Sequence, residues 1–232
     1  MIQVHVGATP WRFDSSRAHH NFSPGNRVTD VIGLTEGSTK WELILASGSP
    51  RRRELLSEAG LSFQIICPDV EELSGDGYSP RDLALTNARL KCMAVSAARP
   101  ESMVIGADTV VTLDGEIYGK PLDLEGAAQN LRIFSGRIHE VLTGVVLSCG
   151  DQRAEFVSNS FVKFRELNEF DIEDYLSKVH VLDKAGGYAA QDHRELIIEK
   201  FEGDYQNIIG LPVSLVLDQL HKMGFPVPTS ES

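Results

Sequence analysis

Long apolar runs are missing from this sequence of 232 residues, and none approaches the roughly 20 residues that a membrane-spanning helix needs. Cysteine is also scarce. The three cysteines, Cys67, Cys92 and Cys149, form no C-x-x-C pair, and each lies in an apolar segment. We therefore expect buried free thiols in a reducing compartment.

Positive charge is in short supply as well. The formal net charge is −11, whereas proteins that bind polymeric nucleic acid usually carry a basic balance or a basic stripe. The composition therefore argues against nucleic acid as the main partner, and the lack of an apolar span argues against a membrane. A small anionic ligand stays open, because its site needs only local positive charge.

Several familiar catalytic patterns are absent too. The chain has no H-E-x-x-H pair, no zinc-finger spacing, no G-x-S-x-G turn and no G-x-x-x-x-G-K-[ST] loop. Ser47, Ser49 and His139 therefore make only a weak case for acyl transfer, and a P-loop hydrolase is disfavoured. His19 and His20 adjoin in a polar stretch, where we expect a solvated pair.

Residues 1–40 differ from the rest in being rich in Ser, Gly, Thr and Asn, with no sustained helical or strand period. We expect a loosely ordered extension without the apolar core of a secretory signal. Asp14 and Asp30 weaken the alternative of a mitochondrial presequence, so we expect a cytoplasmic protein. One domain is then expected over 41–228, with a tail at 229–232.

Within this domain, apolar patterns and turn signals alternate between strand and helix. Expected strands are 43–47, 63–67, 103–113, 116–118, 141–149, 154–164, 187–191 and 195–201; expected helices are 50–59, 80–98, 123–134, 168–178 and 212–223. Asp114-Gly115 is typical of a tight hairpin. This mixture predicts an α/β fold with a mixed twisted sheet and flanking helices.

The first of these helices carries positive side chains at its N-terminus, where positive charge is unfavourable. Ser49 stands at the expected N-cap and Pro50 at the first helical position, yet Arg51, Arg52 and Arg53 follow at once. The helix dipole makes this end positive, so each arginine is unfavourable by roughly 0.3–1 kcal/mol. A bound anion between the arginines and the helix end would remove the conflict.

Other charged residues interrupt apolar patterns. Asp108 lies inside a strand that otherwise reads as fully buried, where an ionised carboxylate needs a cation, a metal or hydrogen-bond donors. The alternative is an aspartate that caps a turn. Lys91 falls on the apolar stripe of its helix, so its amino group either reaches out to solvent or meets a buried anion.

Further polar groups gather at expected strand ends. Lys120 follows the hairpin, and Glu71-Glu72 follow the strand over 63–67, where a carboxylate could reach a divalent ion. Gln191 lies in a short expected strand, and its amide can read the edge of a base. Together the cations Arg51, Arg52, Lys91 and Lys120 and the carboxylates Glu72 and Asp108 suit a polyphosphate with a bridging metal.

Six blocks, in order, now carry a resemblance: "LILASGSPRRRELL", "VEE", "GADTVV…DGEIYGKP", "SGRIHEVLTG", "LDKAGGYAAQ" and "GDYQNIIGLP". The chain from about Glu42 to its last helix resembles the Maf family of nucleotide pyrophosphatases. The resemblance implies two lobes around a nucleotide cleft, as in the inosine triphosphatases. It also implies hydrolysis of nucleoside triphosphates to monophosphate and pyrophosphate, with Mg²⁺ or Mn²⁺.

The resemblance also assigns roles. Asp108 matches the catalytic aspartate that activates water, and Glu72, Lys91 and Lys120 match metal and phosphate residues. Ser49 and Arg52 match the phosphate-binding turn. It further implies a homodimer and a role in cleaning the nucleotide pool.

Subgroups of the family differ at three places. This chain has Arg51, Thr109 and Gln191, and at all three it is similar to the type that acts on dTTP and UTP. Asp192 departs from the usual glycine beside the third place, which puts base preference in question. CTP or modified pyrimidine nucleotides, 7-methyl-GTP, and a nucleotide-binding regulator of cell division that needs no turnover remain open alternatives.

Overall fold

The computed structural model describes residues 28–32, 41–75 and 77–228. Their strands form one mixed sheet in the order β1-β3-β2-β4-β6-β7-β8, with β5 also paired to β4. The strands are β1 (Val28–Ile32), β2 (Leu43–Leu45), β3 (Phe63–Ile66), β4 (Met103–Leu113), β5 (Glu116–Tyr118), β6 (Ile138–Cys149), β7 (Gln152–Phe164) and β8 (Ile198–Glu202). Only the pairs β2–β3 and β2–β4 are parallel among them. The expected α/β class is confirmed.

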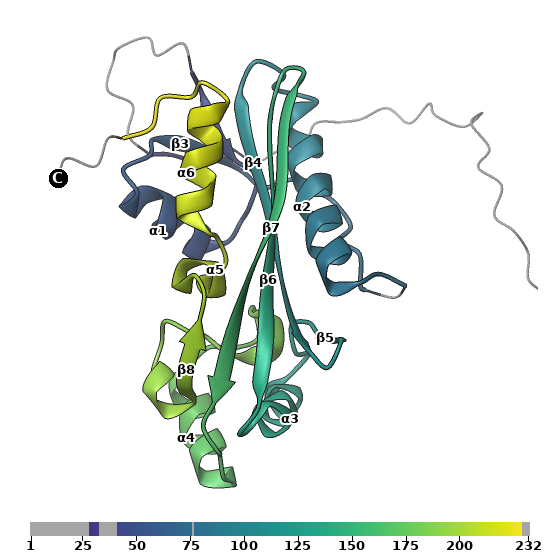
Figure 1. The fold of residues 1–232 in the computed structure, drawn as a ribbon, viewed down its shortest axis with the longest axis vertical. Coiled ribbons are helices and arrows are strands. Elements are labelled where there is room, and N and C mark those ends of the chain that lie inside the picture. Colours follow the sequence, from purple (N-terminus) through teal and green to yellow (C-terminus); the bar gives the residue numbers. More distant parts are fainter. Residues whose placement is uncertain (1–27, 33–40, 76, 229–232) are drawn as a thin grey trace, which may run out of the picture.

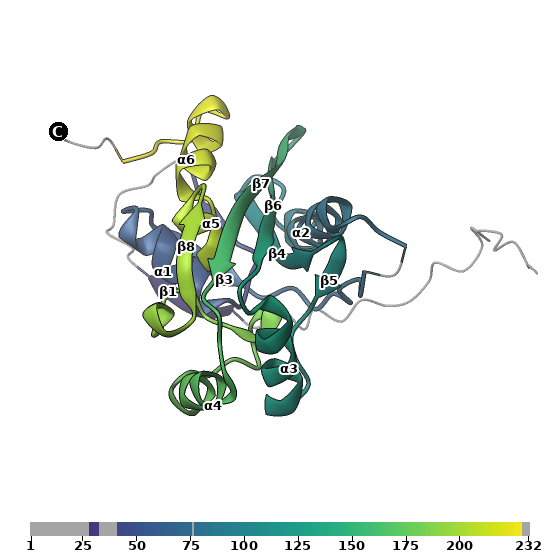
Figure 2. The same ribbon diagram turned by 60° about the horizontal axis from the view of Figure 1, so that its bottom comes forward.

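The helices lie on both faces of this sheet (Figures 1 and 2). They are α1 (Pro50–Glu58), α2 (Pro80–Ser96), α3 (Leu124–Phe134), α4 (Glu169–Lys178), α5 (Tyr205–Ile209) and α6 (Val213–Lys222), with single 3₁₀ turns η1 (Ala185–Gly187) and η2 (Arg194–Leu196). Helix α2 packs on one face through Ala88, Cys92 and Val95. Helices α1 and α6 pack on the other face in one core, and α3 and α4 join a second core.

The two cores divide strand β4 between them. Ala107 belongs to the core with α1 and α6, and Val111 belongs to the core with α3 and α4. Thr109 points to the same face as both, since side chains alternate along a strand. It therefore lies between two lobes that share one sheet, as expected.

One edge of β4 is open where the lobes meet. β6 pairs with one edge of β4 from Val104 to Thr112, so β2 and β5 must use the opposite edge. On that edge β2 pairs with residues 103–105 and β5 pairs with residues 111–113. On this edge, no described strand pairs with the stretch between residues 105 and 111, which carries Asp108 and Thr109.

Several expectations need correction. Residues 187–191 form no strand, because Gly186 and Gly187 have φ angles of 73° and 74°, which extended backbone does not adopt. Helix α5 was not expected. Cys92 is buried, but Cys67 is exposed and Cys149 is half-buried.

Other expectations concern the ends of the chain and its relation to membranes. Of the extension expected to be loosely ordered, the structure describes only β1, which pairs with β3. His19, His20 and the tail at 229–232 lie outside the described residues. In the part of the chain that is described, every helix is too short or too polar to cross a membrane.

Two glycines let α2 approach the sheet closely. A Cβ on Gly106 would lie 2.4 Å from the carbonyl oxygen of Ala88, and one on Gly144 would lie 2.5 Å from that of Ala84. Both obstacles are helix backbone, which cannot move independently of α2. Gly144 pairs with Asp108 across the strands, so this close contact helps to set the distance between α2 and Asp108.

We expect Gly144→Ala to lower the free energy of unfolding by about 1–3 kcal/mol, because the added methyl group must push α2 away from the sheet. Urea denaturation measures the change. Gly119→Ala is the matched control, since a Cβ there meets nothing within 4 Å. Equal stability of the two variants would contradict this account of the packing.

Candidate active site

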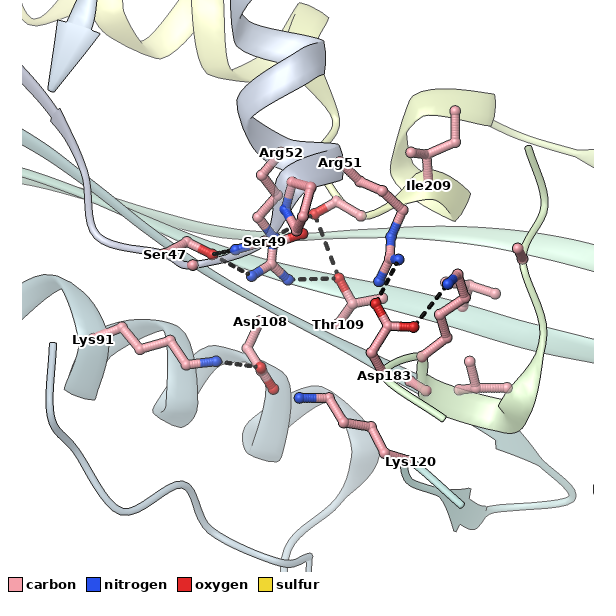
Figure 3. Close-up of a pocket in the computed structure, with 18 of the residues that line it drawn as sticks. Ser47, Ser49, Arg51, Arg52, Lys91, Asp108, Thr109, Lys120, Asp183 and Ile209 are labelled. Atoms are coloured by element: carbon pink, nitrogen blue, oxygen red, sulfur yellow. Dashed lines mark hydrogen bonds and ion pairs between the residues drawn. The ribbon is translucent and has the colours of Figure 1, made fainter. Parts of the chain in front are cut away.

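A cavity of about 360 Å³ lies at the open edge of β4, between the N-terminus of α1 and the segment 183–191 (Figure 3). The residues predicted to form the site all line this cavity: Ser49, Arg51, Arg52, Glu72, Lys91, Asp108, Thr109, Lys120 and Gln191. They come from six separate parts of the chain. The open edge allows this, because side chains from both faces of β4 reach the same space there.

Lys91 lies at the centre of the charged cluster. Its Nζ is 2.7 Å from Oδ1 of Asp108 and 2.9 Å from Oε2 of Glu72. Its side chain is buried, so the amino group does not reach out to solvent but meets the buried carboxylate of Asp108 and the exposed one of Glu72. Figure 3 shows the ammonium groups of Lys91 and Lys120 pointing toward Asp108 from opposite sides.

Asn87, one helical turn before Lys91, is a residue that the sequence analysis missed. Its amide donates to the carbonyl of Leu73 and accepts from the Leu73 N–H, which holds the loop that carries Glu72. It also lies 3.4 Å from Oδ2 of Asp108. The available signal was its position on the same apolar stripe as Lys91.

Glu72 is ionised at neutral pH. Burial raises the pKa of this carboxyl, but the charge of Lys91, its hydrogen bond, and the charges of Lys120 and Arg52 together bring the pKa below its ordinary value. The cluster therefore holds ionised groups of both signs, each stabilised by the other.

Arg52 is buried and faces inward from the first turn of α1. Its Nε donates to the carbonyl of Gly210 at 2.9 Å, Nη1 to the hydroxyl of Ser47 at 3.1 Å, and Nη2 to the hydroxyl of Thr109 at 3.0 Å. These bonds connect α1 to β4 and to the end of α5. The arginine is thus tolerated at a positive helix end because protein oxygens surround it.

Arg51 is directed across the cleft. Its Nη1 lies 3.3 Å from Oδ2 of Asp183, which belongs to the other lobe, and Asp183 also accepts from Lys184. Ser49 stands at the N-cap position as expected, but its hydroxyl makes no capping hydrogen bond, which corrects the predicted cap. The hydroxyl of Ser47 instead accepts from the Ser49 N–H.

Two tyrosine hydroxyls bind the backbone of residues 189–190, which line the cavity just before Gln191. Tyr175 bonds to both the carbonyl and the N–H of Ala189, and Tyr205 donates to the carbonyl of Ala190 at 2.7 Å. Gln191 follows this segment and is exposed. Neither tyrosine could be found from sequence spacing, because both come from distant helices.

The arrangement suits an anionic ligand with several negative charges. Five cations line the cavity: Arg51, Arg52, Lys91, Lys120 and Lys184. The carboxylates of Glu72 and Asp108 line it on the side of α2, and that of Asp183 lines it from the other lobe. A search of protein families matches residues 42–223 to the family described as Maf-like protein. The chain belongs to the Maf family. The match covers both lobes and every residue of the candidate site.

Relatives of this Maf chain are similar over nearly their whole length. A dTTP/UTP pyrophosphatase from Akkermansia muciniphila is 48% identical over 183 residues, which cover 79% of this chain and 97% of that protein. One from Clostridioides difficile is 44% identical over 182 residues, covering 78% and 94%. The solved structure of the Ham1 protein from Staphylococcus aureus aligns with a TM-score of 0.48 and 17% identity, covering 78% of this chain and 99% of that one.

The donor set of this Maf chain fits a divalent cation that is shared with a substrate. The described residues contain no cluster of three or more His, Cys, Asp or Glu side chains that could hold a metal alone. Glu72 and Asp108 offer two carboxylates, both bound by Lys91. Mg²⁺ in proteins commonly takes one or two carboxylates and completes its shell with phosphate oxygens and water.

His139 does not line the Maf cavity but contacts Tyr188, which does. Its Nε2 lies 2.8 Å from the hydroxyl of Tyr188, and its ring stacks on Phe134 at a centroid distance of 4.6 Å. Burial lowers the pKa of His139 to about 3, so the ring stays neutral. Its Nδ1 has no hydrogen-bond partner among the described residues.

We expect His139 to make the fold sensitive to acid. The unfolded chain binds a proton near the ordinary pKa of about 6.5, while the folded chain binds it only at much lower pH. The free energy of unfolding therefore falls by up to about 1.4 kcal/mol per pH unit as pH drops below that value.

His139→Gln keeps a hydrogen-bonding amide for Tyr188 but removes this titration. Urea unfolding at about pH 7 and about pH 4 should show a smaller loss of stability in the variant than in the original chain. Parallel losses would mean that His139 is not the group responsible.

Proposed function

We propose that this chain is a nucleoside triphosphate pyrophosphatase that acts on dTTP and UTP and releases pyrophosphate and the monophosphate. One observation carries the proposal. A buried carboxylate, Asp108, lies against lysines at a cavity that also presents arginines, and these residues belong to the matched family segment. A site that only binds phosphate needs cations but no buried carboxylate beside them.

The two oxygens of Asp108 have different surroundings. Oδ1 accepts from Lys91 at 2.7 Å, whereas the one hydrogen bond to Oδ2 among the described residues is the long contact of 3.4 Å from Asn87. Oδ2 is therefore the oxygen with a lone pair available for a proton. The hydrogen bond from Lys91 to Oδ1 fixes the orientation of the carboxylate.

In the proposed reaction Oδ2 of Asp108 takes a proton from a water molecule while the water oxygen bonds to the α-phosphorus. The bond from that phosphorus to the bridging oxygen of the β-phosphate breaks, and pyrophosphate leaves. Lys91, Lys120 and Arg51 neutralise the charge that develops on the phosphates. Glu72 and Asp108 would hold Mg²⁺ or Mn²⁺, which supplies further neutralisation of phosphate charge when it is bound.

The preference for dTTP and UTP rests on two supports. The curated relatives named above carry the name dTTP/UTP pyrophosphatase. Arg51, Thr109 and Gln191, at which the subgroups of the family differ, all line the cavity. Asp192 is exposed and does not line it, so the departure at this position leaves the lining unchanged.

Pyrophosphate release from a panel of nucleotides tests the function. We expect dTTP and UTP to lead CTP, 7-methyl-GTP and ITP, with Mg²⁺ or Mn²⁺ required and activity lost in a chelator. Turnover led by 7-methyl-GTP would keep the enzyme and overturn the preference. Binding of nucleotide without any turnover would favour the regulator of cell division.

We expect Asp108→Asn to reduce turnover of dTTP by about 10²–10⁴-fold, because the general base is lost. Calorimetric binding of dTTP should persist, since Lys120, Arg51 and Arg52 remain. Asp151→Asn, at the exposed turn between β6 and β7, removes the same charge far from the cavity and is the control. Near-normal turnover in Asp108→Asn would remove the aspartate from the role of base.

A further inference from the structure

A chain of hydrogen bonds runs from the cavity into the sheet behind it. Thr109 of β4 and Thr143 of β6 face each other across the strands, and their hydroxyl oxygens lie 3.1 Å apart. Oγ1 of Thr143 lies 3.2 Å from the carbonyl oxygen of Asn207 in α5. Thr143 itself is fully buried, with no exposed surface, so it cannot touch a ligand in the cavity.

The direction of these bonds follows from the groups that make them. A carbonyl oxygen only accepts, so the single proton of the Thr143 hydroxyl goes to Asn207. The N–H groups of Gly210 and Leu211, which follow α5, both donate to Gln206, so this hydroxyl is the donor that satisfies the Asn207 carbonyl. Thr109 must then donate to Thr143.

The Thr109 hydroxyl is thereby left as an acceptor for Arg52. Its oxygen accepts from Nη2 of Arg52 at 3.0 Å, and its other acceptor, the carbonyl of Gly210, is farther away at 3.4 Å. The protons therefore run in one direction, from Arg52 through Thr109 and Thr143 to Asn207. Reversing the bond between the two threonines would leave the Asn207 carbonyl without its donor.

Thr143 affects two of the three groups that hold Arg52. It fixes Thr109 directly, and through Asn207 it fixes α5, which leads to the carbonyl of Gly210 three residues later. Arg52 has five N–H donors and donates three hydrogen bonds, to Gly210, Ser47 and Thr109. The N–H groups that remain for a ligand are oriented by those three bonds.

We propose that Thr143 is a positioning residue, which sets the plane of the Arg52 guanidinium toward the triphosphate. This proposal rests on the proposed function. Thr143 acts from strand β6, through the Thr109 hydroxyl and the Asn207 carbonyl, and contributes to ligand affinity without contact with the ligand. A planar guanidinium binds phosphate well only at a suitable angle, so a small rotation lowers affinity.

Thr143→Val tests this inference, since it removes the hydroxyl and keeps the shape. We expect the KM for dTTP to rise about two- to ten-fold, as for the loss of one hydrogen bond, with kcat nearly unchanged. The dissociation constant of inorganic tripolyphosphate should rise by the same factor. A purely structural role would lower the amount of active protein, and so kcat, without changing KM.

Three further variants sharpen the test. Thr143→Ser keeps the hydroxyl and should restore the KM. Thr112→Val is the matched control, because Thr112 is a buried β4 threonine whose hydroxyl has no hydrogen-bond partner among the described residues. In a Thr109→Val background, Thr143→Val should raise KM by less than it does alone, because the two hydroxyls act in series.

The outcomes separate this proposal from the proposed function. An unchanged KM and tripolyphosphate affinity in Thr143→Val, or a Thr143→Ser variant as impaired as Thr143→Val, would overturn the positioning role even if dTTP is hydrolysed. If no nucleotide is hydrolysed but Thr143→Val still weakens tripolyphosphate binding and Thr143→Ser does not, the pyrophosphatase function fails and the positioning of Arg52 stands.

Discussion

The site depends on the unpaired stretch of the β4 edge between β2 and β5. Side chains of neighbouring residues in a strand normally point to opposite faces of a sheet and cannot serve one ligand. At this gap the cavity reaches around the edge, so Asp108 on the α2 face and Thr109 on the other face line the same space. Two consecutive residues of β4 thus belong to different sides of the site: Asp108 to the cluster with Lys91, and Thr109 to the side of Arg52.

The buried charges beside this gap are stable because each has partners in the protein. Lys91 has two carboxylates, and Arg52 has three oxygen acceptors from three different segments. Desolvation would otherwise make such groups costly, and removing one partner of a buried pair usually costs more than the pair contributes. The same partners hold the side chains in one arrangement, so the polar network that stabilises the cleft also shapes it.

Much of this arrangement could be predicted from local sequence. Pro50 and Pro80 begin helices where expected, Asp114-Gly115 makes the expected hairpin, and interrupted apolar patterns revealed Asp108 and Lys91. What failed depends on neighbours distant in sequence or on geometry that composition hides. The Ser49 hydroxyl stands at the N-cap but makes no capping hydrogen bond, Gly187 puts a left-handed φ angle into the strand expected at 187–191, and α5 is too short to show a period.

The ion pair between Arg51 and Asp183 makes ligand binding an exchange of anions. A phosphate that binds the guanidinium of Arg51 must displace the carboxylate of Asp183. This carboxylate belongs to the opposite lobe, and its Oδ2 lies 3.3 Å from Nη1 of Arg51. Dissolved salt screens the ion pair of Arg51 with Asp183 as well as the ion pair of Arg51 with the phosphate. The affinity of this cavity for polyphosphates should therefore depend less steeply on ionic strength than its number of cations alone would suggest.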